Sequence, residues 1–197
     1  NIGKHYDIGI YTDMASIRKK IISKLESTHT VLNLFSYTGA FSLAALHTGV
    51  KEVHSVDLSS SYMKQLEENI ELNNLPKEKH FSLTKSVRQA LKSFIEKNKL
   101  FDCIVCDPPS FSSDGHKKSS ILKEYETIIP LMIELLNKNG RLYLFLNTHK
   151  TTWNIFEGKI KTILKPFSDI VIEKRMNLGE DCRRLKGFPE GDYLKGL

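Results

Sequence analysis

Short apolar runs alternate with longer amphipathic stretches along most of this chain. The apolar runs are rich in β-branched and aromatic residues and have polar boundaries, which is typical of buried strands. They predict strands over residues 30–35, 52–56, 80–84, 101–106 and 141–146. Helices are predicted over residues 39–47, 59–72, 86–97, about 120–138 (ending at Asn139-Gly140) and 151–164. Strands that alternate with helices of this length form βαβ units, so we predict a doubly wound α/β domain with a mainly parallel sheet.

The two ends of the chain predict smaller elements. Residues 4–12 predict a short extended segment or hairpin around Gly9, and apolar residues at helical spacing from Met14 to Leu25 predict a first helix. Strand-like segments cover residues 169–175 and 193–194. We therefore expect one domain over residues 1–197, in which residues 1–29 lead into the core. The chain begins at Asn1, which leaves room for an additional N-terminal domain.

Charge and cysteine content limit the classes of protein. The 29 Lys and Arg residues against 23 Asp and Glu residues give a net charge of +6, which is compatible with a polyanionic partner without requiring one. Cys103, Cys106 and Cys182 are odd in number and lack the spacing of a metal site or a disulfide framework. We expect a reducing, cytoplasmic setting and no bound metal. No apolar run is long enough to span a bilayer, and we see no signal peptide, so no membrane partner is expected.

Asp107-Pro108-Pro109-Ser110-Phe111 directly follows the predicted strand over residues 101–106. The two prolines cannot donate backbone N–H groups, so the strand must stop with Asp107 at its carboxyl end. Ligands of open α/β sheets bind beyond the carboxyl ends of the strands. Taken alone, this pentapeptide is equally compatible with a substrate clamp and with a tight turn that carries a solvated aspartate.

Two further strand ends carry features of a nucleoside site. The strand over residues 30–35 turns through Ser36-Tyr37-Thr38-Gly39 into a helix, but it lacks the glycine pattern of dinucleotide and nucleoside triphosphate sites. Asp57 ends the next strand about 20 residues later, where a carboxylate accepts hydrogen bonds from ribose hydroxyls. Asp57 and Ser59 are equally suited to capping the following helix. The three strand ends together favour a cofactor that contains a nucleoside and no phosphate.

The residues Asn33 to Phe41, Asp57 and Asp107 to Phe111 resemble the S-adenosylmethionine-dependent class I methyltransferases. Within them the chain resembles the bacterial enzymes that methylate bases of large-subunit ribosomal RNA, the group with cytosine-5 and guanine-N7 enzymes. The similarity covers nearly the whole chain, because Gly9, Asp13 and Arg18 match residues before that family's first core helix and residues 188–197 resemble its closing segment. The chain departs from the family at Met14-Ala15, where Gln or His and then Arg are usual, and at Ser86, where an acid is common.

This resemblance implies a Rossmann-like class I methyltransferase fold, with a doubly wound, mainly parallel sheet of seven strands whose last strand is antiparallel. It also implies S-adenosylmethionine as cofactor and RNA, in particular large-subunit ribosomal RNA, as partner. The cofactor-binding residues would be Arg18, Phe35, Ser36, Tyr37, Thr38, Gly39, Phe41, Asp57, Leu58, Ser59, Ser86, Val87 and Asp107. The catalytic residues would be Asp107, Pro108, Pro109, Phe111 and Asn147, with the prolines and Phe111 stacking on an extruded base.

The cysteine positions bear on which atom is methylated. Carbon 5 of a pyrimidine is a poor nucleophile and normally needs a cysteine thiolate, which follows the fifth strand in the cytosine-5 relatives. Here Asn147-Thr148-His149 follows that strand, Cys106 lies inside a strand and Cys182 lies in a remote polar segment. Asn147 matches the guanine-N7 pattern, so we predict a nitrogen acceptor and keep cytosine C5 as the alternative.

Other functions remain open at this point. A protein or a small molecule could be the methyl acceptor, or the chain could be an inactive methyltransferase fold that binds RNA. Six basic residues in predicted loops are suited to RNA phosphates or simply to solvent, namely Lys117, Lys118, Lys150, Arg183, Arg184 and Lys186.

Overall fold

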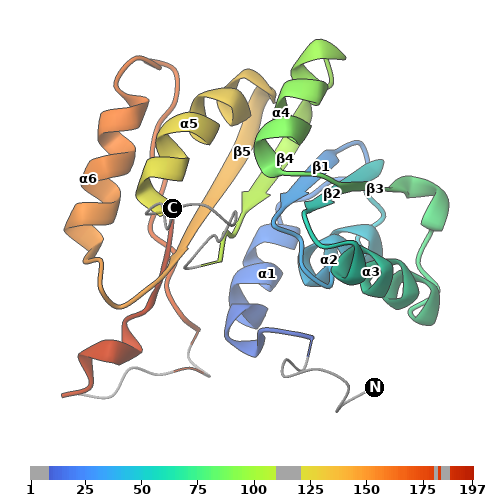
Figure 1. Cartoon of the computed structure of the whole chain (residues 1–197), viewed down its shortest axis with the longest axis horizontal. Coiled ribbons are helices and arrows are strands. Elements are labelled where there is room, and N and C mark those ends of the chain that lie inside the picture. Colours follow the sequence, from blue (N-terminus) through green and yellow to red (C-terminus); the bar gives the residue numbers. More distant parts are fainter. Residues whose placement is uncertain (1–8, 110–120, 180–181, 183–186) are drawn as a thin grey trace.

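Six strands form one sheet in the order β3-β2-β1-β4-β5-β6 in a computed structural model that describes residues 9–109, 121–179, 182 and 187–197 (Figure 1). Strands β1 to β5 are parallel, and β6 is antiparallel to β5. The strands are β1 (Thr30–Leu34), β2 (Glu52–Asp57), β3 (His80–Thr84), β4 (Phe101–Cys106), β5 (Leu136–Asn147) and β6 (Leu194–Gly196). This arrangement confirms the predicted α/β fold with an antiparallel last strand, but the described residues form six strands and not seven.

Helices cover both faces of the sheet (Figure 1). Helices α1 (Ala15–Ile22), α2 (Ala40–His47) and α3 (Ser60–Leu72) pack on one face, and helices α4 (Val87–Glu96), α5 (Ile121–Glu134) and α6 (Trp153–Leu164) pack on the other. Side chains alternate along β1 accordingly, because Val31 joins the first core and Leu32 and Leu34 join the second. The described residues also form the short 3-10 helices η1 (Thr12–Met14), η2 (Lys77–Lys79) and η4 (Pro189–Gly191). None of the described helices is long and apolar enough to cross a bilayer.

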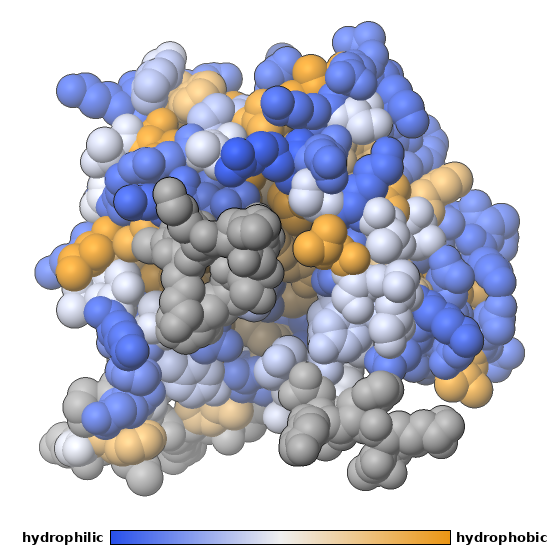
Figure 2. Space-filling model, viewed as in Figure 1, coloured by the Kyte–Doolittle hydropathy of each residue, from blue (hydrophilic) through white to orange (hydrophobic). Residues whose placement is uncertain are grey.

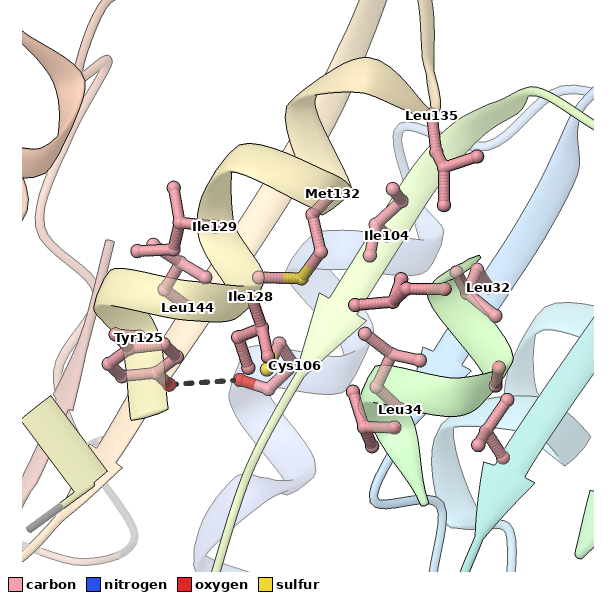
Figure 3. Close-up of a cluster of buried hydrophobic side chains, with 14 of the residues drawn as sticks. Leu32, Leu34, Ile104, Cys106, Tyr125, Ile128, Ile129, Met132, Leu135 and Leu144 are labelled. Carbon is pink, nitrogen blue, oxygen red and sulfur yellow. Dashed lines mark hydrogen bonds between the residues drawn. The ribbon is translucent and has the colours of Figure 1, made fainter. Parts of the chain in front are cut away.

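Tyr125 of α5 lies between the carboxyl ends of strands β4 and β5 (Figure 3). Its ring is fully buried, and its hydroxyl lies 2.5 Å from the carbonyl oxygen of Phe145 in β5 and 3.5 Å from that of Cys106 in β4, so that its single proton is shared between two strand ends. Isoleucine and methionine side chains from the next turns of α5 lie beside it against β4 and β5. The residues that follow β4 therefore start from a rigid position.

The predicted helix over about 120–138 is too long. Helix α5 ends at Glu134, and β5 already begins at Leu136, which pairs with Phe101. The pairing then shifts register, and Asn137 donates to the Asp102 carboxylate at 2.7 Å. Asn139, with φ of 66°, lies in an irregularity of the strand and does not mark a helix end.

Two other predicted elements differ at the ends of the chain. Residues 169–175 form no strand, because contact with β6 is limited to an isolated bridge between Met176 and Gly196, and Val171 is 81% exposed. Most of the hairpin predicted around Gly9 lies outside the described residues. The described part bends at Gly9 and continues into η1.

Candidate functional site

A cavity of about 890 Å³ opens where the five parallel strands end. Residues at or just after each carboxyl end line it, namely Phe35, Asp57, Lys85, Asp107 and Asn147. Figure 2 shows a hollow near the middle of this face of the molecule, with hydrophobic residues at its edge. This is the edge of an open α/β sheet at which ligands bind.

Most of the residues predicted from the sequence meet in this cavity. Those that line it are Arg18, Phe35, Ser36, Tyr37, Phe41, Asp57, Leu58, Ser59, Ser86, Val87, Asp107, Pro108, Pro109 and Asn147. Thr38 and Gly39 are not among the lining residues, and Phe111 lies outside the described residues. Residues from distant parts of the chain are thus brought to one site.

The carboxylate of Asp57 joins two loops of the cavity. Its Oδ2 accepts from the backbone N–H of Tyr37 at 2.9 Å, and its Oδ1 accepts from the backbone N–H of Ser59 at 2.9 Å. Ser59 itself caps α3, because its hydroxyl accepts from the N–H of Tyr62. Each carboxylate oxygen retains a further acceptor position, so the same group that orders the turn can also accept two hydroxyl donors.

Thr38 and Gly39 support the first loop from behind. The Thr38 hydroxyl donates to the carbonyl oxygen of Gly9, and its own carbonyl oxygen accepts from Asn69 at 3.1 Å. Gly39 has φ of 89°, and a Cβ atom there would lie 2.4 Å from Cγ of Leu66. The glycine is therefore required by the close approach of α2 to α3 and by the left-handed backbone.

Three tyrosine rings form a chain beside Asp57. Tyr37 lies edge-on to Tyr62 with ring centroids 4.6 Å apart, and Tyr11 lies 5.5 Å from Tyr37 on the other side. Leu58 is 62% exposed at the same rim. This end of the cavity offers flat apolar surfaces next to a carboxylate, which suits a base with its ribose. Sequence reasoning missed Tyr11 and Tyr62; Tyr62 was detectable from its place in the first turn after Asp57.

Asp13, Arg18 and Asp107 form a cluster of charged groups that lines the same cavity, and Arg18 also donates to the backbone carbonyl oxygen of Tyr11 at 3.0 Å. Burial raises the pKa of Asp107 to about 7, the negative charge of Asp13 adds to this rise, and Arg18 opposes it. Burial also lowers the pKa of Arg18, against the two carboxylates. Two carboxyl groups therefore lie near one half-buried guanidinium group, and this excess of acidic groups favours an additional positive charge from a ligand.

Asp13 is the least satisfied member of this cluster. Its Oδ2 accepts from the hydroxyl of Tyr193 at 2.7 Å. Its Oδ1 is buried and has no hydrogen-bond partner within the described part of the chain. A buried carboxylate oxygen without a donor is costly, so it indicates a donor that arrives with a ligand. The sequence marked Asp13 only through its match to the family pattern.

Several other lining residues were missed. Lys85 and Arg88 lie at the β3 side, where Arg88 donates to Thr127 at 3.0 Å and lies 3.6 Å from Glu124. Asn33, a buried polar residue of β1, also reaches the cavity. The sequence signals for these residues were positive charge, for Lys85 and Arg88, and a polar residue within an apolar strand, for Asn33. Both signals are common in residues that have no function.

No cysteine lines the cavity within the described residues. Burial raises the pKa of the Cys103 thiol to about 12 and that of Cys106 well above its usual value, so neither is a ready nucleophile. Cys182 is half-buried, and the pKa of Tyr193, which donates to Asp13, is raised by burial first, then by Asp13, and least by Cys182.

Comparisons with known proteins show the family of this chain. A family model of S-adenosylmethionine-dependent methyltransferases matches residues 1–159. Ribosomal RNA large subunit methyltransferase I of Pseudoalteromonas translucida is 34% identical over 96% of this chain and 48% of that protein. The protein of the same name from Aeromonas salmonicida is 32% identical over 100% of this chain and 50% of that protein. The chain thus spans about half the length of the curated relatives it matches.

Solved structures of methyltransferases share this fold. The crystal structure of SMU.776 complexed with SAH aligns with a TM-score of 0.85 and 29% identity, over 95% of this chain and 49% of that one. The S-adenosylmethionine-dependent methyltransferase of Agrobacterium tumefaciens shares the fold, with a TM-score of 0.70 and 20% identity over 80% of this chain and 51% of that one.

Proposed function

Because this chain belongs to the S-adenosylmethionine-dependent methyltransferase family, we propose that it transfers a methyl group from S-adenosylmethionine to a base of large-subunit ribosomal RNA. The names of the curated relatives support the RNA target. The methyltransferase domain would occupy residues 1–197, with residues 1–29 leading into its core.

Two groups of lining residues in one cavity carry this proposal. Asp57 with the tyrosines suits the ribose and the adenine, and Ser86 and Val87 complete that side. The cluster of Asp13, Arg18 and Asp107 suits a zwitterionic amino acid, because Arg18 matches a carboxylate and the two acids match an ammonium group. An adenosine and an amino acid are the two parts of S-adenosylmethionine.

The cofactor supplies a methyl group on a sulfonium, which an acceptor atom displaces in line. The chain contributes position, and holding two reactants in a productive geometry is worth up to about 7–11 kcal/mol in favourable cases. Pro108 and Pro109 form a rigid wall after β4, whose end is fixed by Tyr125. A base that is stacked on such a wall would present its edge towards the centre of the cavity, and stacking is worth about 1–3 kcal/mol per base.

We propose a nitrogen of the base as acceptor, in the manner of guanine N7. A nitrogen lone pair needs no covalent intermediate, and the described lining offers Asn147 after β5 and no thiol. Methylation of cytosine C5 is the alternative, and Cys182 is the residue that it would need. The raised pKa of Cys106 and its full burial remove that thiol from consideration.

RNA phosphates would bind at the cavity rim. Lys85 is exposed there, and Lys150 is exposed after β5. The other predicted phosphate contacts, Lys117, Lys118, Arg183, Arg184 and Lys186, lie outside the described residues. The net charge of +6 agrees with such a contact.

Two measurements test the proposal. Calorimetry should show binding of S-adenosylmethionine, and Asp57→Ala should weaken it by tenfold or more, because hydrogen bonds from the ribose and the order of the loop are lost. Absence of binding heat would favour an inactive methyltransferase fold.

Labelled methyl transfer into deproteinised ribosomal RNA from a strain that lacks the protein should give a product, and nucleoside mass spectrometry should identify it as a base methylated on nitrogen. Labelled 5-methylcytosine would overturn the choice of acceptor but not the enzyme class.

A further inference from the structure

A chain of four polar side chains crosses the first core, from the outer strand of the sheet to the cavity. His80 of β3 lies with its Nε2 at 2.8 Å from Oγ of Ser55 in β2. Ser55 Oγ lies 2.7 Å from Oγ of Ser42 in α2, and Ser42 Oγ accepts from Nδ2 of Asn33 in β1 at 2.9 Å. Ser42 and Ser55 are fully buried and Asn33 is 2% exposed, so water does not compete with these bonds.

The protonation of His80 Nε2 limits which group donates in each of these three hydrogen bonds. A serine hydroxyl has one proton, so each serine that donates to one neighbour must accept from the other. If Nε2 of His80 accepts from Ser55, then Ser42 donates to Ser55 and the amide of Asn33 donates to Ser42. If Nε2 carries the proton, Ser55 accepts from it, and since a hydroxyl oxygen can accept two bonds, neither serine is then forced to donate in a given direction and Ser42 can meet either the nitrogen or the oxygen of the amide.

The direction decides which atom of Asn33 remains for the cavity. With Nε2 as acceptor, Nδ2 is engaged by Ser42, and Oδ1 has no partner among the described residues. An amide oxygen can accept from an ammonium group, whereas an amide nitrogen would oppose one. Burial lowers the pKa of His80 to about 4, with His54 adding to the effect and Glu67 opposing it, so the ring is neutral at neutral pH and its tautomer sets the direction.

We propose that His80 is a positioning residue, which acts through Ser55 and Ser42 to make Asn33 present its carbonyl oxygen to the amino group of the cofactor. This inference rests on the proposed function, because it assumes that the amino-acid end of S-adenosylmethionine lies at the β1–β4 side of the cavity. Binding of the ammonium group and the tautomer of His80 are then coupled, although His80 is two strands away from Asn33.

Nitrogen NMR of the histidine rings tests the direction. The protein labelled with ¹⁵N-histidine is saturated with S-adenosylhomocysteine, and the signal of His80 is assigned by its loss in His80→Phe. We expect an unprotonated Nε2 and a protonated Nδ1 in this complex. A protonated Nε2 in the complex would overturn the proposal.

Binding of two ligands tests the consequence. S-adenosylhomocysteine carries the amino group, and 5′-methylthioadenosine lacks the whole amino-acid end. Ser55→Ala and His80→Phe should each weaken the binding of S-adenosylhomocysteine by about tenfold. The affinity for 5′-methylthioadenosine should stay within about twofold of that of the unchanged protein. Ser82→Ala is the matched control, because Ser82 lies on the same face of β3 and donates to Glu67 outside the chain of bonds.

The remaining outcomes are distinguishable. Equal weakening of both ligands would assign these residues a purely structural role and overturn the proposal, as would unchanged affinity for S-adenosylhomocysteine in both variants. If neither ligand binds the unchanged protein, the proposed function itself fails. Retained binding of 5′-methylthioadenosine also shows that each variant is folded.

Discussion

We expect Asp107 to make stability depend on pH, because burial and, to a lesser extent, the negative charge of Asp13 raise its pKa. In the folded protein its pKa is raised to about 7 from the usual 3.8, so the folded state keeps a proton that the unfolded chain releases. Stability therefore falls as the pH rises from about 4 to about 7 and stays level above that range. An uncharged side chain of the same shape would avoid this loss.

We expect Asp107→Asn to be more stable than the unchanged protein at pH 8, and the difference to shrink at pH 5.5. Urea unfolding at the two pH values in the absence of ligand measures it. Asp169→Asn, at an exposed aspartate, is the control. A difference that grows on acidification would contradict the assigned protonation.

Substitution of Cys182 distinguishes a nitrogen acceptor from cytosine C5. If the acceptor is a nitrogen, Cys182→Ser should keep the rate of methyl transfer within about twofold, because no covalent step needs the thiol. Loss of activity by a factor of about 10³ with unchanged cofactor affinity would instead assign the thiol to a covalent step. Radiolabelled transfer and calorimetry on the same preparation give both quantities.

At the scale of elements, the contact of α2 with α3 controls the shape of the cofactor loop. Gly39→Ala places a methyl group against the buried side chain of Leu66 and imposes a left-handed backbone on alanine. We expect a loss of about 1–3 kcal/mol of stability and weaker binding of S-adenosylmethionine.

Urea unfolding and calorimetry check this expectation. Gly49→Ala is the matched control, because Gly49 has φ of 82° but its added Cβ would meet nothing within 4 Å. Similar losses in the two variants would show that backbone strain alone, without the Leu66 contact, sets the cost.

Local sequence patterns predicted the elements that build the site better than those at the periphery. The five parallel strands and the cap at Ser59 follow from apolar runs and polar boundaries, which are local properties. Helix α5 ends early because β5 pairs with Phe101 of β4, a contact that local spacing does not encode. Residues 169–175 have the composition of a strand, but the β-bridge to β6 is made by Met176, just after this segment.

The same distinction applies to the site. Asp57 and Asp107 were predictable because strands end at them, whereas Tyr11, Tyr62 and Lys85 enter the cavity through the packing of separate elements. The role of Gly39 could not be predicted, since Leu66 reaches it only in the folded protein.

At the scale of the whole molecule, the excess positive charge becomes informative only where it is exposed near the cavity. Lys85→Glu should weaken binding of a ribosomal RNA fragment by about three- to tenfold and reduce the salt dependence of the binding constant, because phosphate contacts release counterions. Fluorescence anisotropy at two salt concentrations measures both effects.

Lys92→Glu makes the same charge change on an exposed part of α4 that does not line the cavity. It should leave the affinity nearly unchanged. Equal effects of the two variants would mean that RNA responds to net charge and not to the cavity rim.

Strand β6 has a consequence for how the protein is made. It pairs with β5 from about 50 residues further along the chain, Leu194 lines the cavity, and Tyr193 holds Asp13. Until residues 193–197 have emerged from the ribosome, the edge of β5 lacks its partner β6, and the cavity lacks the side chain of Leu194. The nascent chain would acquire cofactor binding late, after the rest of the sheet has formed.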